Sequence, residues 1–375
     1  MPLAVVGENP NIVFGLGSKR TQWLGVDFTP QAITVAQVKR QGNTTKLIHL
    51  ATTPMPAGGM ADGRILDPPS VGLALQDLLA EQKIKTNKLA VATAIPGREA
   101  TLRILRLPAG LSDADMEAVI LEQEASVVIP FPLNEVDLDY QPLGIELGAD
   151  GTEQQEVLLV ATPKDTVDTY LETIAAASLE LQCVELASFA LIRSIRNQVV
   201  SFARQEAIAI ANIGYDATEM TVILGGVPQF ARTIQIGVST MQDTLGRALN
   251  IAPGTTDALL YQIKLPLADA GGPRTTGNPG SVAVSRTLNE LADELQRSID
   301  FFTTQNTSTP ITQLFLAGRG ATVKDIDAYL GQLVGCSVSL IDPLADLALP
   351  ANFDGEQFPP PAVGVAIGLG LREDP

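Results

Sequence analysis

Aromatic, histidine and cysteine residues are all scarce in this chain. Aromatic residues make up 5% of the 375 positions, so Leu, Ile, Val and Ala must build its hydrophobic cores. The single histidine, His49, lies in an alternating stretch and is expected to be a sheet residue, which leaves little room for a catalytic triad or a histidine–cysteine zinc site. Cys183 and Cys336 lie far apart in apolar stretches, which favours buried free thiols over a disulfide.

Positive charge is also in short supply. The chain has 25 Lys and Arg residues against 42 Asp and Glu residues, a formal net charge of −17. This balance argues against nucleic acid as a partner and against broad docking on anionic lipid. We interpret the acidity as a contribution to solubility.

No apolar run reaches the length needed to span a bilayer. The candidates near residues 182–192 and 362–371 are interrupted by Glu185 or are too short. Residues 8–10 (Glu-Asn-Pro) precede any long apolar run, so the N-terminus lacks the pattern of a secretory signal. We therefore expect a cytoplasmic protein that a partner recruits to the inner membrane.

Three short glycine-bearing turns each follow an apolar run, at residues 24–27, 211–214 and 316–321. Each turn alone is weak evidence, because glycine after a strand is common. Together they suggest two similar halves that face a shared cleft, with backbone turns aimed at a phosphate-bearing ligand. The chain length itself predicts two or three domains.

Two runs of three strands, joined by short turns, predict two antiparallel meanders. The strands are expected at 23–28, 33–38 and 46–52, and again at 207–213, 218–224 and 227–236. Helices and strands follow each meander, so the order meander–helix–strand–helix occurs twice. This weak repetition of topology favours a duplicated α/β fold.

Residues 97–156 differ in character and predict a small inserted α/β subdomain. Ser112 is expected to cap a helix that runs to about Val127, followed by a strand over 136–141 and a loop over 144–151. Thr162-Pro163 is expected to begin the next helix, after a strand that ends there.

Farther along, a helix is predicted over 188–204, a loop over 266–281 and a long helix over 288–303.

The turns offer groups that suit a nucleotide. A strand-end carboxylate such as Asp27 can hold Mg²⁺, usually through water. A tight turn around 213–217 presents N–H groups to phosphate oxygens, and Gly318 and Gly320 let the backbone approach a base or ribose. Simple turns and helix caps are the favoured explanation of each feature when it is taken alone.

The order of these motifs resembles the actin-like ATPase fold, and within it the PilM family of type IV pilus assembly proteins, which is related to the division protein FtsA. The similarity covers roughly residues 22–372. Its most distinctive part is Ile129-Pro130-Phe131-Pro132 leading to Leu138-Asp139-Tyr140. Shorter matches lie at 94–99, 188–191, 226–228 and 297–300.

The resemblance implies a duplicated RNase H-like (actin-like ATPase) α/β fold, with two lobes around a nucleotide cleft. It also implies four subdomains and a C-terminal helix: 1A over 22–92 and 161–206, the inserted 1C over 93–160, 2A over 207–240 and 295–355, 2B over 241–294, and a helix over 356–372 that returns to 1A.

The resemblance further implies two kinds of ligand: ATP with Mg²⁺ in the cleft, and the short cytoplasmic N-terminal tail of the membrane protein PilN in a groove between 1A and the insert. Other pilus assembly components are further expected partners. The nucleotide positions carried over are Asp27 (also for the metal), Phe28, Thr29, Asn212, Gly214, Tyr215, Gln262, Lys264, Gly318, Arg319 and Gly320. The tail positions carried over are Ile129, Pro130, Phe131, Leu138 and Tyr140.

Glu185 lies near the place where relatives position a water for ATP hydrolysis. A strand-end carboxylate that meets solvent is the alternative for this residue. A weak ATPase activity is left open by the resemblance.

This sequence departs from the family pattern in ways that predict weak nucleotide binding. Pro30 in the first turn has no N–H to donate, and Thr34 stands where a lysine is expected. Asn212 replaces the usual aspartate, and Gln262 replaces a glutamate. Arg319 interrupts a run of glycines, where it would crowd the base or contact phosphate.

Two alternative functions have less support in the residues. A sugar-kinase-type enzyme on the same fold needs a base over a substrate hydroxyl, and the sequence shows no clear candidate for one. An FtsA-like division protein usually carries a basic amphipathic tail, whereas this chain ends in the short acidic stretch 371–375. An actin-like adaptor is therefore the favoured interpretation.

Overall fold

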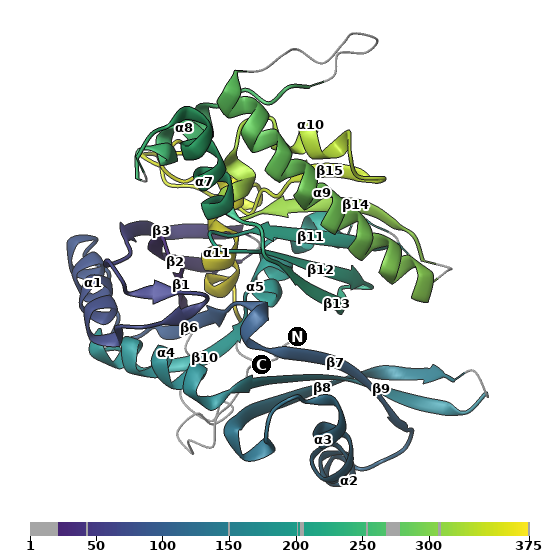
Figure 1. Cartoon of the computed structure of the whole chain (residues 1–375). Helices are drawn as coiled ribbons and strands as arrows, with labels where there is room; N and C mark the ends of the chain where they lie inside the picture. The colour runs from purple at the N-terminus through teal and green to yellow at the C-terminus, as the bar shows by residue number, and fades with distance from the viewer. Residues whose placement is uncertain are drawn as a thin grey trace.

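Two open sheets with the same strand order organise the chain in a computed structural model (Figure 1), which describes residues 22–42, 44–148, 151–200, 202, 206–252, 254–267, 278–306 and 309–373. The first sheet runs β10-β6-β1-β2-β3-β16 and the second runs β13-β12-β11-β14-β15. In each sheet the first three strands in sequence form an antiparallel meander. A fourth strand, β6 or β14, pairs in parallel with the first strand of the meander, and a fifth, β10 or β15, pairs in parallel with the fourth. This duplication confirms the predicted meanders.

We call the first sheet with its helices lobe I and the second lobe II. The strands of lobe I are β1 (Trp23–Phe28), β2 (Ala32–Gln41), β3 (Thr44–Pro54), β6 (Ala90–Ile95), β10 (Leu181–Leu186) and β16 (Leu347–Ala348), with the small pair β4 (Met60–Ala61) and β5 (Arg64–Ile65). Those of lobe II are β11 (Ala207–Ile213), β12 (Thr218–Leu224), β13 (Val227–Ile234), β14 (Ile311–Ala317) and β15 (Ser337–Leu340).

Helices cover both sheets. Lobe I carries α1 (Pro68–Glu81), α4 (Lys164–Ala176), α5 (Ala187–Ser194) and α6 (Arg196–Val200), and lobe II carries α7 (Val238–Leu249), α8 (Thr256–Gln262), α9 (Pro279–Gln305) and α10 (Ile326–Gly331). Within the described ranges, none of the helices combines the length and the apolar character that a bilayer crossing requires.

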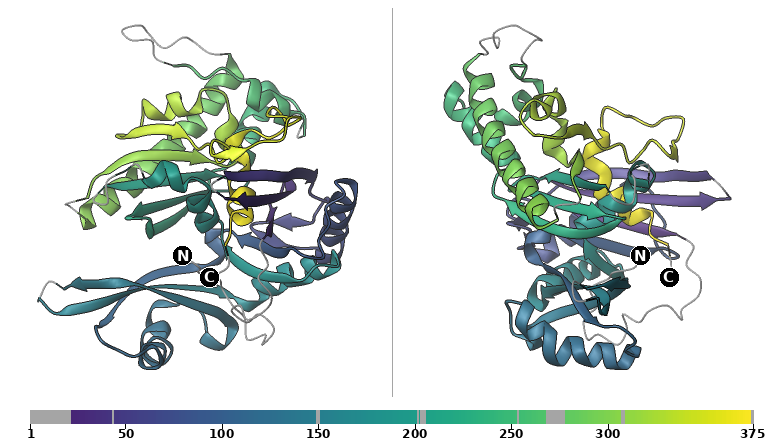
Figure 2. Two further views of the ribbon diagram at one scale, coloured as in Figure 1. Left: turned by 180° about the vertical axis from the view of Figure 1, so that it is seen from behind. Right: turned by 90° about the vertical axis from the view of Figure 1, so that its right-hand side faces the viewer.

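The helix α11 (Gly364–Gly370) lies between the two sheets, and all seven of its residues are buried (Figure 2). It packs closely because small residues face it. A Cβ on Gly25 would meet Leu369 Cβ at 2.6 Å, and one on Gly368 would collide with the backbone of Ala190. The packing of α11 on lobe I therefore depends on small residues.

Residues 97–163 form a separate small unit, which we call the insert. Its sheet, in the order β7-β9-β8, consists of β7 (Thr101–Pro108), β8 (Val136–Leu147) and β9 (Glu153–Pro163), and its helical segment contains α2 (Asp113–Val119) and α3 (Ala125–Val128). The insert has its own hydrophobic core, which includes Leu107, Ile120 and Leu159. The predicted inserted subdomain is thus present, while the exact subdomain limits stay a prediction.

Several local predictions hold. The Ser112 side chain caps α2 by accepting a hydrogen bond from Asp115 N–H at 3.2 Å. His49 lies in β3, and both cysteines are free thiols, with Cys183 buried and Cys336 partly buried.

Other local predictions are wrong. The strand β7 was not predicted from the sequence, and β8 continues to Leu147 across part of the predicted 144–151 loop. Thr162 lies in β9 and does not cap α4, because its hydroxyl donates to Glu99 O at 2.6 Å.

Two helix predictions also need correction. The predicted helix over 188–204 breaks at Ile195, between α5 and α6. The long helix begins at Pro279 inside the predicted 266–281 loop, where Asn278 caps it. Most of that loop lies outside the described residues.

Candidate functional site

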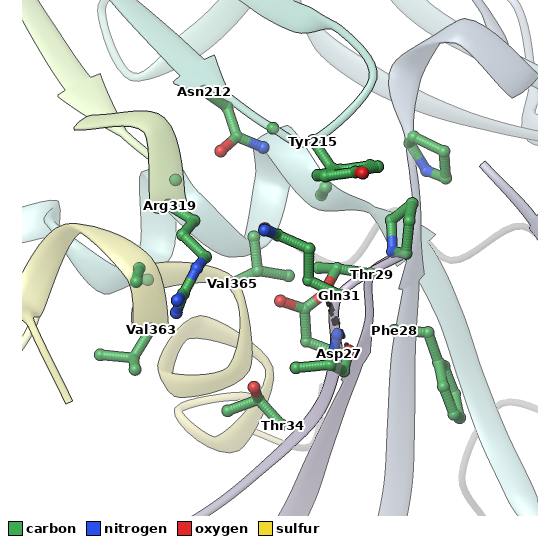
Figure 3. A pocket seen from close by; sticks show the side chains of 18 of the residues that line it. Asp27, Phe28, Thr29, Gln31, Thr34, Asn212, Tyr215, Arg319, Val363 and Val365 are labelled. Atoms are coloured by element: carbon green, nitrogen blue, oxygen red, sulfur yellow. Dashed lines mark hydrogen bonds between the residues drawn. The ribbon is translucent and has the colours of Figure 1, made fainter. Parts of the chain in front are cut away.

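Turns from both lobes meet at one pocket between the sheets (Figure 3). Eight of the predicted nucleotide positions line it: Asp27, Phe28, Thr29, Asn212, Gly214, Tyr215, Gly318 and Arg319. The segment 357–365 closes one side. The cavity volume is about 170 Å³, below the roughly 300 Å³ at which small-molecule sites usually begin.

Two carboxyl groups enter this pocket from different lobes. Asp27 ends β1, and Glu219 lies on β12 directly opposite Asn212. Burial raises the pKa of Asp27 to about 7, with a further contribution from the charge of Glu219. Burial also raises the pKa of Glu219 to about 7, although the N–H groups of Arg98 and Gly97 oppose that shift. Sequence reasoning missed Glu219. Because β11 and β12 are joined by a short turn, counting residues from Asn212 across that turn would have identified Glu219 as the residue opposite it.

The turn between β1 and β2 pairs most of its own N–H groups. Thr29 N–H donates to Ala32 O at 2.9 Å, and Ala32 N–H donates to Thr29 O at 3.2 Å. Pro30 has no N–H. Among the described residues, this turn therefore leaves only the Gln31 N–H without a partner, which is a poor cradle for phosphate.

The turn between β11 and β12 is partly paired as well. Gly214 N–H donates to Ala217 O at 2.9 Å. The Asp216 carboxylate at this turn is paired with Arg98, whose Nη2 lies 3.2 Å from its Oδ2, and both side chains line the pocket. The turn keeps some backbone donors.

The third turn, η4 (Arg319–Thr322), comes after β14. Gly318 N–H donates to Pro361 O of the chain itself at 2.7 Å. A Cβ on Gly320 would collide with the Ile213 side chain. The structure thus gives Gly320 a packing role, and this residue does not line the pocket as expected.

Arg319 is held on its own lobe. Its guanidinium lies 5.1 Å from the centre of the Tyr261 ring and 3.5 Å from Asp257 Oδ2. Gln262 ends α8 and Lys264 lies two residues beyond it, and neither lines the pocket.

Glu185 is a clear correction, because it does not reach the cleft. Its side chain is fully buried, and its oxygens accept hydrogen bonds from Arg193 at 2.6 and 2.8 Å and from Arg372 at 2.7 Å. A carboxylate occupied by two guanidinium groups cannot orient a water near Asp27. Its role is to join β10, α5 and the C-terminal segment.

These residues fit Mg-ATP poorly. A Mg²⁺ ion bound with a nucleotide takes only one or two carboxylates from the protein, which Asp27 could supply, so the misfit lies in the groups that would bind the phosphates. The lysine position is occupied by Thr34, whose hydroxyl lies 3.3 Å from that of Thr52. A triphosphate would meet turns whose N–H groups are partly paired within the chain, three carboxyl groups (Asp27, Asp216 and Glu219) and the guanidinium groups of Arg98 and Arg319.

The predicted tail positions lie at the base of β8 in the insert. Pro130 is exposed, Phe131 is 41% exposed, and Leu138 and Tyr140 are partly buried. Ile129 is only 5% exposed and belongs to the core of the insert, so the expectation of a surface contact at this residue is corrected. Leu138 and Tyr140 pack against the same core, so Pro130 and Phe131 are the exposed apolar residues of this set.

Comparison with known proteins agrees with this architecture. The family model of type IV pilus assembly protein PilM matches residues 25–374. A chain of the solved PilM-PilN type IV pilus biogenesis complex is 25% identical, with a TM-score of 0.79, over 94% of this chain and 98% of that chain.

The ethanolamine utilization protein EutJ from Carboxydothermus hydrogenoformans is similar in fold alone, at 13% identity and a TM-score of 0.53, over 97% of this chain and 93% of that one. The actin-like ATPase fold expected from the sequence is confirmed by these neighbours. The chain belongs to the family of type IV pilus assembly protein PilM.

Proposed function

We propose that this protein is a cytoplasmic actin-like adaptor of type IV pilus assembly that holds the N-terminal tail of PilN. The observation that carries the proposal is the family match over residues 25–374, together with the likeness to a chain of the PilM-PilN complex across 94% of this chain. Binding of that tail would bring this acidic chain to the inner membrane.

The tail would dock on the insert beside α3 and the start of β8. Phe131 presents an aromatic ring there, and Val127 is 80% exposed nearby in sequence. A contiguous apolar patch built from such side chains would form an interaction surface. We expect an apolar anchor of the tail to pack against Phe131.

The surroundings of Tyr140 indicate the charge of the partner. Burial raises the pKa of the Tyr140 hydroxyl, and the nearby carboxylates of Glu117, Asp113 and Asp139 raise it further. A surface with this negative potential suits a tail that carries lysine or arginine next to its apolar anchor.

Titration of a fluorescent PilN tail peptide, followed by anisotropy, tests this proposal. Phe131→Asp should weaken binding at least about tenfold, the effect of losing one anchor contact worth about 1.4 kcal/mol. The matched control is Ile145→Asp, which changes an apolar residue 58% exposed on the same insert.

Ile145 is nine positions beyond the start of β8, about 30 Å along the strand. The control should therefore bind like the parent protein. The proposal fails if the parent protein does not bind the peptide, or if both variants lose the same affinity.

A further inference from the structure

Arg98 connects the two lobes at the base of the insert. It lies in the short turn η1 (Gly97–Glu99) after β6 of lobe I. Its Nη2 is 3.2 Å from Asp216 Oδ2 of lobe II, and its Nη1 is 3.5 Å from Asp62 Oδ1 of lobe I. Its N–H also donates to Glu219 Oε1 of lobe II at 3.4 Å.

The Arg98 side chain is well shielded from solvent, at 15% exposed, and so is Asp216, at 23%. A pair shielded in this way is screened less by salt than a surface pair. Arg98 also lies against Gly63, where a Cβ would come within 2.9 Å of its Nε. The guanidinium is therefore confined between the lobes.

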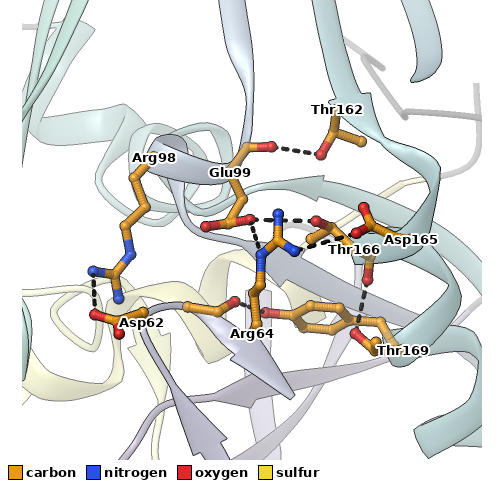
Figure 4. Close-up of polar contacts among 10 residues, drawn as sticks. Asp62, Arg64, Arg98, Glu99, Thr162, Asp165, Thr166 and Thr169 are labelled. Atoms are coloured by element: carbon orange, nitrogen blue, oxygen red, sulfur yellow. Dashed lines mark hydrogen bonds and ion pairs between the residues drawn. The ribbon is translucent and has the colours of Figure 1, made fainter. Parts of the chain in front are cut away.

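The residue next to Arg98 is firmly fixed (Figure 4). Glu99 accepts a hydrogen bond from Arg64 at 2.7 Å and from the Thr166 hydroxyl at 3.3 Å, while its carbonyl accepts from Thr162 at 2.6 Å. These contacts join η1 to the end of β9 and to α4. Arg98 thus projects toward lobe II from a rigid base.

In a nucleotide clamp of this fold, a phosphate ligand would bridge the two lobes. In this protein, backbone N–H groups that could bind such a phosphate are paired within the chain instead, at Thr29, Gly214 and Gly318. The charge that bridges the lobes is instead the Arg98 guanidinium, which pairs with Asp216 of lobe II.

We propose that Arg98 holds the cleft of this protein closed, so that the two lobes keep their relative position without Mg-ATP. Asp216 is the partner of its guanidinium in lobe II, while Glu219 accepts from its backbone N–H, a contact that does not need the side chain. The proposal concerns the cleft and stands whether or not the tail binds the insert.

Double electron–electron resonance between one spin label in each lobe tests the proposal. Suitable exposed positions are Asp77→Cys in α1 and Ala258→Cys in α8, which lie on the same side of the molecule in different lobes (Figure 1). Cys336→Ser removes the partly buried native thiol, and Cys183 is buried.

In the labelled parent we expect one narrow distance distribution that millimolar Mg-ATP leaves unchanged. Arg98→Ala should broaden the distribution and shift it to longer distances. The matched control Arg106→Ala removes another arginine–carboxylate pair, with Glu156 at 3.1 Å inside the insert, and should match the parent.

Two results would overturn the proposal. The first is a distance distribution of the parent that Mg-ATP makes narrower or shifts to shorter distances. If Arg98→Ala abolishes that response to Mg-ATP, Arg98 is a phosphate ligand. The other is an Arg98→Ala distribution identical to the parent. If that variant does not fold, Asp216→Asn replaces it, and a distribution unchanged by Asp216→Asn contradicts the proposal.

Discussion

The two lobes share one strand order and differ in the segment that comes after the fourth strand. In lobe II, β14 leads into the tight turn η4 and then to α10, whereas in lobe I, β6 leads into η1 and then to the whole insert. The two turns occupy equivalent places, and each contains an arginine after a glycine: Gly97-Arg98 and Gly318-Arg319.

The two arginines are used differently. Arg98 reaches Asp216 of the opposite lobe, while Arg319 stays with Tyr261 and Asp257 of its own lobe. The duplicated turn has become a link between the lobes on one side and a local packing contact on the other. A fold can therefore keep its symmetry while equivalent turns take different structural roles.

The largest effect is expected at the end of β10, where lobe I has a buried ion cluster. Glu185→Ala would leave Arg193 and Arg372 without their counter-charge, and should lower the free energy of unfolding by about 3–5 kcal/mol in urea titrations. Glu373→Ala is the matched control, because Glu373 pairs with Arg40 on the surface. Equal losses in the two variants would refute a structural role for Glu185.

The equivalent glycines should respond unequally. Gly318 has φ of 83°, and a Cβ there would meet Asn212 Oδ1 at 2.5 Å, so Gly318→Ala should cost about 2–3 kcal/mol of stability. A Cβ on Gly97 has its nearest neighbour, the Glu219 carboxyl group, at 3.7 Å. Gly97→Ala should change stability by less than about 0.5 kcal/mol. Thermal unfolding compares the two, and similar losses would show that the turns are not used differently.

A smaller effect is expected from pH. The pKa of Glu219 is about 7 in the folded protein, far above its usual value. Between the unfolded and folded pKa values the native state binds the extra proton, so this contribution to stability is present at low pH and is lost as the pH rises through 7.

Glu219→Gln removes the titrating carboxyl group, so the variant should not lose this part of its stability as the pH rises. Relative to the parent, this variant should gain about 1–3 kcal/mol between about pH 5 and pH 8. Glu294→Gln, in a pair with Arg232 on lobe II, should show no such gain. Parallel pH profiles for Glu219→Gln and the parent would contradict the raised pKa that burial gives Glu219.

The lobes and their meanders could be predicted from sequence because the signals are local. Alternating apolar residues and short turns predicted β1 and β11 with their observed limits, 23–28 and 207–213. The strand β7 escaped because Arg103 and Arg106 interrupt its apolar pattern, although they lie on its more exposed positions.

The site could be predicted only in part, because its decisive contacts are long-range. Glu185 was misplaced since one of its partners, Arg372, is 187 residues away in sequence. Ile129 belongs to a recognisable motif, yet only packing against the insert's sheet shows that it is buried. The pairing of Gly318 with Pro361 likewise depends on the C-terminal segment folding back over the cleft.

The most direct test of a nucleotide-independent adaptor is titration of the PilN tail peptide with and without millimolar Mg-ATP. We predict saturable binding with the same dissociation constant in both conditions, because the insert provides the surface and the chain's own groups hold the cleft. Binding that appears only with Mg-ATP would contradict nucleotide independence, and no binding in either condition would contradict the adaptor itself.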